Sequence, residues 1–301
     1  ELQPYSHAKW DPSLERMHAN EMPWRAQGDN SIAGLNRYPE PQPKALVERL
    51  ARLYEVPAER VLVGRGSDEA IDLLVRAFCR AGVDRVVTCP PTFGFYKVAA
   101  RVQGASVVEV PLLEDGYRLD TEAVIRAGRD AKIVFLCSPN NPTGNLIDEG
   151  DLLRVCRELA TSSLVCVDEA YLEFTQRPSL ASRLDEFPNL VILRTLSKAY
   201  ALAGSRCGTL IAGEEIVSLL KRIIPPYAIP ESTVEDVLRL TEAPQRAIAG
   251  ERIRTLLVER EKMRARLEVN PAVVKVFPSD ANFLLVQCRD VGQHGIDQPD
   301  R

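Results

Sequence analysis

Residues 194–206 read RTLSKAYALAGSR, and they follow the apolar run LVIL at 190–193, which predicts a buried strand. A lysine at the mouth of such a strand is expected to be desolvated, which favours the neutral, nucleophilic form of its amine. Ser197 and Arg206 add a hydroxyl and a forked cation, two groups that suit a phosphate. With Lys198 between them, the stretch suits a ligand that carries both an aldehyde and a phosphate.

Composition places the chain among ordinary globular proteins. Of its 301 residues, 45% are hydrophobic and 27% are charged, and the formal net charge is -4. This balance gives no basic surface, so it argues against nucleic acid or an anionic membrane as a partner. No apolar run reaches the length of a membrane span, and residues 1–12 lack the apolar core of a signal peptide.

The cysteines and histidines indicate the compartment and argue against a metal site. The seven cysteines form no C-x-x-C pair, and several lie inside apolar runs, as in a reduced cytoplasmic protein. The three histidines form no H-E-x-x-H motif, so we expect no metal. The sequence therefore predicts a cytoplasmic protein without disulfides.

Three apolar segments share one pattern and predict the fold class. Residues 132–137, 164–167 and 190–193 each read as a strand, and polar groups follow each strand end: Asn141, Asp168 and Lys198. Continuous apolar strands that alternate with helices predict an α/β protein with a mainly parallel sheet between two helical layers. Because parallel strands end at one edge of a sheet, we expect these three residues to converge there.

A glycine-containing turn predicts the phosphate end of the site. The strand 61–63 leads into Gly64-Arg65-Gly66-Ser67-Asp68 and then into a helix, whose first N–H groups form an anion site. The alternative is that Ser67 only caps the helix. Glu69 stands where a third glycine would complete G-x-G-x-x-G, which argues against a nicotinamide-dependent oxidoreductase.

These groups together suit pyridoxal 5'-phosphate (PLP). Its ring nitrogen needs a carboxylate that keeps it protonated, and Asp168 fits this need. The ring oxygen needs hydrogen-bond donors, which Asn141 and Tyr171 provide.

Five motifs resemble the fold-type I PLP-dependent aminotransferases, and within them the histidinol-phosphate aminotransferase family. They are SPNNPTG at 138–144, DEAY at 168–171, the stretch 194–206, NRYPE at 36–40 and CPPTFG at 89–94. The match extends from about residue 4 to residue 286. The resemblance implies a transfer of an amino group between L-histidinol phosphate and 2-oxoglutarate, with L-glutamate as the other product, in histidine biosynthesis.

The resemblance also implies a role for each site residue. Lys198 would hold PLP covalently and move a proton, while Asp168 and Tyr171 complete the catalytic set. The full cofactor set would be Ser67, Asp68, Phe93 stacked on the ring, Asn141, Asp168, Tyr171, Thr195, Ser197, Lys198, Arg206 and Tyr38. Tyr38 would reach the phosphate from a partner subunit, which implies a homodimer. Asn20, Glu21 and Tyr38 would lie near the substrate.

The sequence also predicts an organisation into parts. We expect an arm or part of a small domain over 1–35, a large PLP-binding domain over 36–240 and a small α+β domain over 241–301, with both termini contributing to the small domain. A helix is predicted over 244–267, with an apolar stripe of Ile253, Leu256, Leu257, Met263 and Leu267, followed by strands over 273–277 and 282–286.

The family's arginine-bearing segment beyond these strands has no counterpart, so the small domain is expected to be truncated. The alternatives left open are a related PLP enzyme, either an aromatic aminotransferase or a threonine-phosphate decarboxylase, and a PLP-binding but inactive truncated chain.

Overall fold

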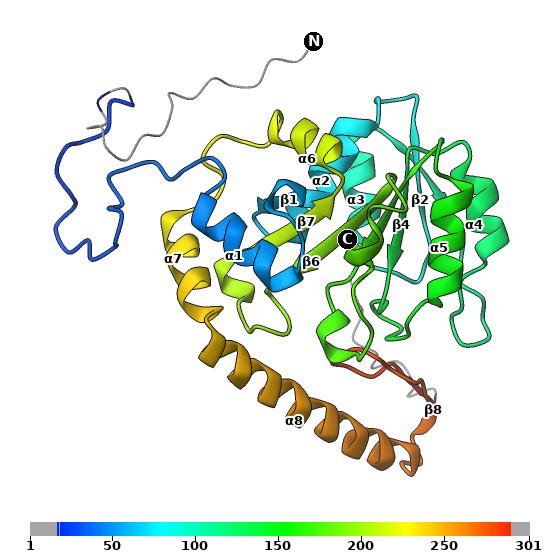
Figure 1. Cartoon of the computed structure of the whole chain (residues 1–301). Coiled ribbons are helices and arrows are strands. Elements are labelled where there is room, and N and C mark those ends of the chain that lie inside the picture. Colours follow the sequence, from blue (N-terminus) through cyan, green and yellow to red (C-terminus); the bar gives the residue numbers. More distant parts are fainter. Residues whose placement is uncertain (1–16, 18, 290–301) are drawn as a thin grey trace.

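The structure is a computed structural model that describes residue 17 and residues 19–289, and a seven-stranded sheet forms its centre (Figure 1). Its strands are β1 (Val61–Gly64), β2 (Arg85–Thr88), β3 (Ser106–Glu109), β4 (Ile133–Cys137), β5 (Leu164–Asp168), β6 (Leu190–Thr195) and β7 (Gly208–Ala212). They lie in the order β1-β7-β6-β5-β4-β2-β3. Strand β7 runs antiparallel to both of its neighbours, and the other pairings are parallel.

The central strands are buried on both faces, which explains their continuous apolar sequences. Every residue of β4, β6 and β7 is buried. Such strands need helices on both sides of the sheet, and Figure 1 shows them in front of it and behind it. The predicted α/β class with a mainly parallel sheet is therefore confirmed.

The surrounding helices present apolar faces to the sheet and to one another. They are α1 (Lys44–Tyr54), α2 (Ser67–Phe78), α3 (Phe95–Gln103), α4 (Thr121–Gly128), α5 (Glu149–Glu158), α6 (Glu214–Lys221) and α7 (Glu231–Leu240). Helix α2 packs against β6, β7 and α3, whereas α4 packs against α5. The described residues also form four short 3-10 turns: η1 (Ala58–Arg60) between α1 and β1, η2 (Leu172–Phe174) and η3 (Leu180–Arg183) between β5 and β6, and η4 (Ala203–Ser205) between β6 and β7.

The long helix α8 (Ala243–Glu268) leaves the body of the molecule and leads to a two-stranded antiparallel sheet of β8 (Val273–Val276) and β9 (Val286–Cys288) (Figure 1). The predicted helix and its bounds are confirmed to within one residue. The predicted strand over 282–286 is wrong, because the described strand begins only at Val286. The division into three domains stays a prediction.

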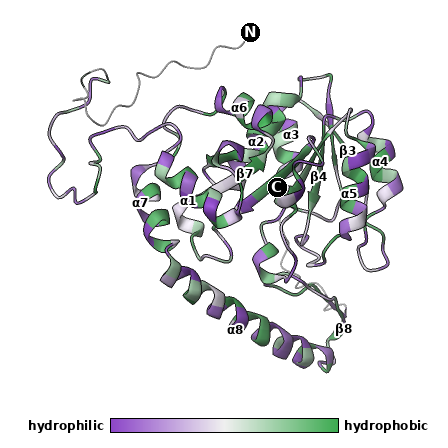
Figure 2. Ribbon diagram, viewed as in Figure 1, coloured by the Kyte–Doolittle hydropathy of each residue, from purple (hydrophilic) through white to green (hydrophobic). Residues whose placement is uncertain are grey.

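The apolar stripe predicted on α8 is only partly correct. No residue of this helix is buried, and Figure 2 shows polar residues along its whole length. Ile253, Leu256 and Leu257 pack on a small cluster around Tyr171 and Phe174, whereas Met263 is 59% exposed. The stripe ends where α8 passes beyond that cluster.

Residues 19–43 form an irregular segment that extends from α1 (Figure 1). The backbone N–H of Ile32 donates to Glu235 on α7. Within residue 17 and residues 19–289, no helix is long and apolar enough to cross a membrane.

Candidate active site

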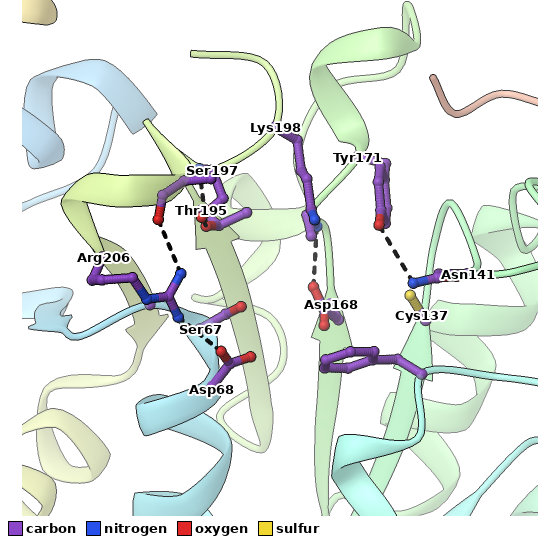
Figure 3. Close-up of a pocket in the computed structure, with 14 residues that line it drawn as sticks. Ser67, Asp68, Cys137, Asn141, Asp168, Tyr171, Thr195, Ser197, Lys198 and Arg206 are labelled. Carbon is purple, nitrogen blue, oxygen red and sulfur yellow. Dashed lines mark hydrogen bonds and ion pairs between the residues drawn. The ribbon is translucent and has the colours of Figure 1, made fainter. Parts of the chain in front are cut away.

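The carboxyl ends of the parallel strands surround a pocket, as the sequence predicts (Figure 3). Asn141, Asp168 and Lys198 all line it, although they follow three different strands. The pocket is also lined by Gly66, Ser67, Asp68, Phe93, Cys137, Ala170, Tyr171, Thr195, Ser197, Ala203 and Arg206. Ten of the eleven residues predicted to bind the cofactor therefore lie together, and Tyr38 does not.

Asp168 ends β5 and is almost completely buried at the floor of the pocket. Its Oδ2 accepts a hydrogen bond from the Tyr96 hydroxyl at 2.7 Å, and its Oδ1 accepts one from the Ala170 N–H at 3.0 Å. Burial raises the pKa of Asp168, and these two hydrogen bonds oppose that rise because they favour the ionised carboxylate. Asp168 is thus a buried acid whose charge is supported by fixed donors.

The amino end of α2 forms the opposite side of the pocket. Gly66 precedes the helix with a φ of 84°, a left-handed conformation that glycine adopts without strain. Gly208 on β7 allows the turn to approach closely, since a Cβ at Gly208 would lie 2.3 Å from the Ser67 nitrogen. The first N–H groups of α2 therefore face an anion-binding position.

The acidic side chains at this helix end are held by arginines. Glu69 accepts hydrogen bonds from the Arg65 backbone and side chain. Asp68 pairs with Arg206 at 2.9 Å, and both side chains are about half exposed. Beside them, the Thr195 hydroxyl is 3.0 Å from that of Ser197. Hydroxyl, guanidinium and backbone donors thus gather at one end of the pocket (Figure 3).

Tyr171 and Asn141 lie at the other end, where the Asn141 amide donates to the Tyr171 hydroxyl at 3.4 Å. Burial raises the pKa of Tyr171 to about 12, so its hydroxyl stays protonated at neutral pH. Because the phenol oxygen accepts from Asn141, its own hydrogen is available to a ligand. These two residues can supply the pair of donors that a phenolate oxygen needs.

The Lys198 side chain points into the pocket toward Asp168 (Figure 3), and its amine lies 5.6 Å from the centre of the Tyr171 ring. The expectation that Lys198 is desolvated is wrong, because the residue is exposed. The reason is its position: it lies three residues beyond the end of β6, on the rim of the pocket rather than within the sheet. Its accessible amine can still attack an aldehyde.

Tyr38, Asn20 and Glu21 lie apart from this pocket, in a shallow depression with Arg37 and Glu231. Glu21 accepts hydrogen bonds from Arg37 and from the Tyr38 backbone. The Tyr38 ring stacks on Tyr227 with centroids 4.6 Å apart. Within one chain, the predicted substrate residues are therefore together but do not join the cofactor residues.

The donor set of the main pocket fits PLP. It combines an anion-binding helix end, an accessible amine, a buried carboxylate and two donors for a ring oxygen. Phe93 adds an aromatic ring beside them. Among the described residues, no group of three or more His, Cys, Asp or Glu side chains is arranged to hold a metal ion.

Comparison with known proteins agrees with this chemistry. The sequence model described as aminotransferase class I and II matches residues 14–291. The chain belongs to this family. As a class I and II aminotransferase it is a PLP-dependent enzyme.

Among the relatives of this aminotransferase are two proteins named histidinol-phosphate aminotransferase. The one from Stenotrophomonas maltophilia is 48% identical over 91% of this chain and 76% of its own length. The one from Idiomarina loihiensis, numbered 2, is 43% identical over 96% of this chain and 82% of its own length. The solved histidinol-phosphate aminotransferase of Sinorhizobium meliloti, in complex with PLP, has a TM-score of 0.77 and 26% identity over 84% of this chain and 68% of that one.

Two features of this aminotransferase site were not predicted from the sequence. The first is the Tyr96–Asp168 hydrogen bond, which joins residues 72 positions apart. The second is a buried ion triad, in which Arg194 pairs with Glu169 at 3.1 Å and with Glu173 at 2.7 Å. No local pattern marks either feature, since each depends on how the strands and helices pack.

The triad lies directly beside the pocket residues. Glu169 follows Asp168, Glu173 lies in η2 just after Tyr171, and Arg194 precedes Thr195. Glu169 also accepts from the Ser179 hydroxyl at 2.6 Å and from the Leu180 N–H at 2.9 Å. Burial raises the pKa of Glu169, and Arg194 opposes that rise. The triad therefore ties the ends of β5 and β6 together.

Proposed function

We propose that this aminotransferase transfers an amino group between L-histidinol phosphate and 2-oxoglutarate, giving imidazole-acetol phosphate and L-glutamate in histidine biosynthesis. The observation that supports it most is the 43–48% identity to proteins named for this reaction, over nine-tenths or more of the chain. The intact pocket supports it further. We expect the cytoplasm as its compartment, because its seven cysteines are free and six of them are buried.

Different residues would bind different parts of PLP. Lys198 would bind it covalently, while Asp168 would pair with the ring nitrogen and Phe93 would stack on the ring. Asn141 and Tyr171 would donate to the ring oxygen. The phosphate would be held by Thr195, Ser197, Arg206 and the backbone of Ser67 and Asp68.

Bound PLP supplies an electron sink for the electrons released when a substrate Cα–H bond breaks. Lys198 would take the proton from Cα, and its flexible four-carbon stem lets the same amine return that proton at another atom. Asp168 would keep the ring nitrogen protonated from a buried position that excludes water. Tyr171 would hold the ring oxygen in place through its protonated hydroxyl.

A homodimer is part of this proposal. Tyr38 lies outside its own chain's pocket, and the residue is 50% exposed. Tyr38 would reach the phosphate of the partner's cofactor, with Asn20 and Glu21 close to the substrate. The pocket would then contain residues of both subunits.

Substrate competition tests the proposed reaction. The purified protein is assayed with 2-oxoglutarate and either histidinol phosphate, tyrosine or O-phosphothreonine. We expect the highest kcat/KM for histidinol phosphate, with glutamate formed in equal amount. A preference for tyrosine would indicate an aromatic aminotransferase, and release of CO2 from O-phosphothreonine would indicate a decarboxylase. Covalent PLP binding without turnover of any substrate would indicate an inactive chain.

Mixed dimers test the contribution of Tyr38. Lys198→Ala and Tyr38→Phe subunits are each impaired, but a mixed dimer has one intact pocket if Tyr38 acts across the interface. Activity should therefore rise when the two variants are mixed and exchange subunits. If subunit exchange is shown by mass and activity does not rise, Tyr38 serves its own chain.

A further inference from the structure

Tyr96 is a completely buried residue in the first turn of α3. It is not one of the residues that line the pocket, so we expect it to contact residues of the site and not the cofactor itself. Its hydroxyl donates to Asp168 Oδ2 at 2.7 Å, the short distance of a hydrogen bond to a charged acceptor. Tyr96 therefore acts on the site only through other residues.

The Tyr96 ring is fixed by two other rings. It stacks on Phe135 of β4, with centroids 4.9 Å apart and planes only 5° apart. It also meets Phe93 edge to face, with centroids 5.5 Å apart at 85°. Aromatic pairs prefer these geometries, so the hydroxyl is held where it meets Asp168. One side chain thus contacts both the carboxylate and the aromatic ring of the cofactor site.

We propose that Tyr96 is a positioning residue that keeps Asp168 ionised and thereby keeps the shared proton on the ring nitrogen of PLP. This inference rests on the proposed pairing of Asp168 with that nitrogen. It does not depend on which amino donor the enzyme uses.

Some groups around Asp168 favour its neutral form and others favour its carboxylate form, which explains why a hydrogen-bond donor is needed to keep it ionised. Burial favours the neutral acid, and the negative charge of Asp68 adds to this. Lys198 and the Ala170 N–H favour the carboxylate. Cys137 and Tyr171 also lie near Asp168, but burial raises the pKa of both, so they are neutral at physiological pH.

The position of the proton decides the strength of the electron sink. If Asp168 took the proton, the ring nitrogen would become neutral and would withdraw electrons less well. A hydroxyl that donates to the carboxylate stabilises its charge and opposes this transfer. Each carboxylate oxygen has two acceptor positions, so Oδ2 can accept from Tyr96 and retain a position for another donor.

Tyr96→Phe tests this inference, because it removes one oxygen and keeps the stacked ring. The ¹⁵N chemical shift of ¹⁵N-labelled PLP bound without substrate reports whether the ring nitrogen carries a proton. We expect a protonated nitrogen in the unsubstituted protein and a shift toward the unprotonated value in Tyr96→Phe. The kcat should fall by about 10- to 150-fold, the rate equivalent of the about 1.5–3 kcal/mol that a hydrogen bond to a charged group is worth.

The protein without PLP gives a second readout. With ¹³C-labelled aspartate carboxyls, and with the Asp168 signal assigned by its absence in Asp168→Asn, the pKa of Asp168 should rise by roughly 1 unit or more in Tyr96→Phe. Tyr54→Phe is the matched control, because it removes another buried hydroxyl at a residue that does not line the pocket. Phe135→Leu loosens the ring stack but keeps the hydroxyl, and it should change both readouts less.

The outcomes separate this inference from the role of Asp168. An unprotonated ring nitrogen in the unsubstituted protein would overturn both the role of Tyr96 and the role of Asp168 as the group that keeps this nitrogen protonated. A protonated nitrogen there, with the same ¹⁵N shift and Asp168 pKa in Tyr96→Phe, would overturn only the role of Tyr96. An equal change in Tyr96→Phe and Phe135→Leu would show that ring packing, and not the hydroxyl, is responsible.

Discussion

Arg194 and Arg264 each pair with two carboxylates, and the two arginines lie in very different surroundings. Arg194 meets Glu169 and Glu173 beside the pocket, and its side chain is only 8% exposed. Arg264 meets Glu261 and Glu268 on α8, and its side chain is 44% exposed. The pairing distances are similar, from 2.7 to 3.1 Å. Geometry alone therefore does not tell the two networks apart.

The difference lies in what surrounds them. Water screens the α8 network, so its pairs contribute little to stability. The Arg194 triad is removed from water, so the loss of its cation would leave two buried carboxylates uncompensated. The same contrast holds for the whole regions, because β4 and β6 are completely buried whereas α8 has no buried residue. Substitutions at the pocket edge should therefore have large effects, and equivalent ones on α8 small effects.

The largest difference in effect on activity is expected between substitutions of two lysines, one in the pocket and one on α8. Lys198→Ala should abolish the visible absorption band of covalently bound PLP and lower kcat by at least about 10⁴-fold, because one amine both binds the cofactor and moves the proton. Lys262→Ala on α8 is the control, since its exposed ammonium pairs with Glu259, which also lies on α8. Borohydride reduction and peptide mapping should label Lys198. A label on another lysine would overturn the assignment.

Substitutions of Arg194 and Arg264 should give the next largest difference, which is one in the free energy of unfolding. Arg194→Met should destabilise the fold by about 3–5 kcal/mol, because it leaves buried charge unpaired. Arg264→Met should change the free energy of unfolding by less than about 1 kcal/mol. Urea unfolding of the protein without PLP measures both values. Equal losses would show that burial does not distinguish the networks.

The triple substitution Arg194→Met, Glu169→Gln and Glu173→Gln sharpens this test. It removes the cation together with both negative charges, so it should recover much of the stability that Arg194→Met loses. No recovery would indicate that Arg194 stabilises the protein by packing, for example on the Tyr54 ring 4.9 Å away, and not by charge.

Truncation of an apolar side chain should also have different effects on stability in the two regions, but the difference should be smaller. Leu193→Ala in β6 should cost about 2–5 kcal/mol, because it leaves a cavity in a completely buried strand. Met263→Ala on α8 should stay within about 0.5 kcal/mol, since this side chain is 59% exposed. Thermal and urea unfolding measure both. A cost above about 1 kcal/mol for Met263→Ala would show that a partner covers this face in solution.

Strand β7 was not predicted, although all of its residues are buried. Strands β4, β5 and β6 were predictable because burial on both faces leaves a strong local pattern. The ends of these strands were predictable for the same reason. Because parallel strands end at one edge of the sheet, the convergence of Asn141, Asp168 and Lys198 was predictable as well. β9 was misplaced because its preceding residues are equally apolar but have another role. There, Phe283 packs edge to face on Tyr171 with centroids 5.3 Å apart, so the apolar run fills a cluster instead of a strand.

The supporting contacts of the site could not be predicted from local patterns. The sequence contains many tyrosines and arginines, and nothing local indicates that Tyr96 meets Asp168 or that Arg194 meets Glu169. These contacts join residues 72 and 25 positions apart. They depend on the order of the strands and on the packing of α3, which only the folded structure provides.

The smallest difference in stability is expected between substitutions of two carboxylates, Asp84 and Glu259, whose pKa values are lowered in the folded protein. Asp84, just before β2, has its pKa lowered to about 2 by hydrogen bonds from the Arg80 side chain and backbone. On α8, a hydrogen bond from Lys262 lowers the pKa of Glu259, but both of these side chains are more than half exposed. The Asp84 carboxylate is only 8% exposed, so its contacts should contribute more to stability than those of Glu259.

The direction of the pH dependence follows from the lowered pKa. A carboxyl whose pKa is lower in the folded state stabilises the fold fully above its unfolded pKa of about 3.9, and this contribution is lost as the pH falls toward 2. Asp84→Asn should therefore lower the urea midpoint at pH 7 and pH 5, and the gap to the unsubstituted protein should narrow below pH 4. Glu259→Gln should show almost no gap at any of these pH values. A gap for Asp84→Asn that stays constant from pH 7 to pH 3 would mean that the carboxylate charge adds no stability, since the asparagine oxygen can accept the same hydrogen bonds from Arg80.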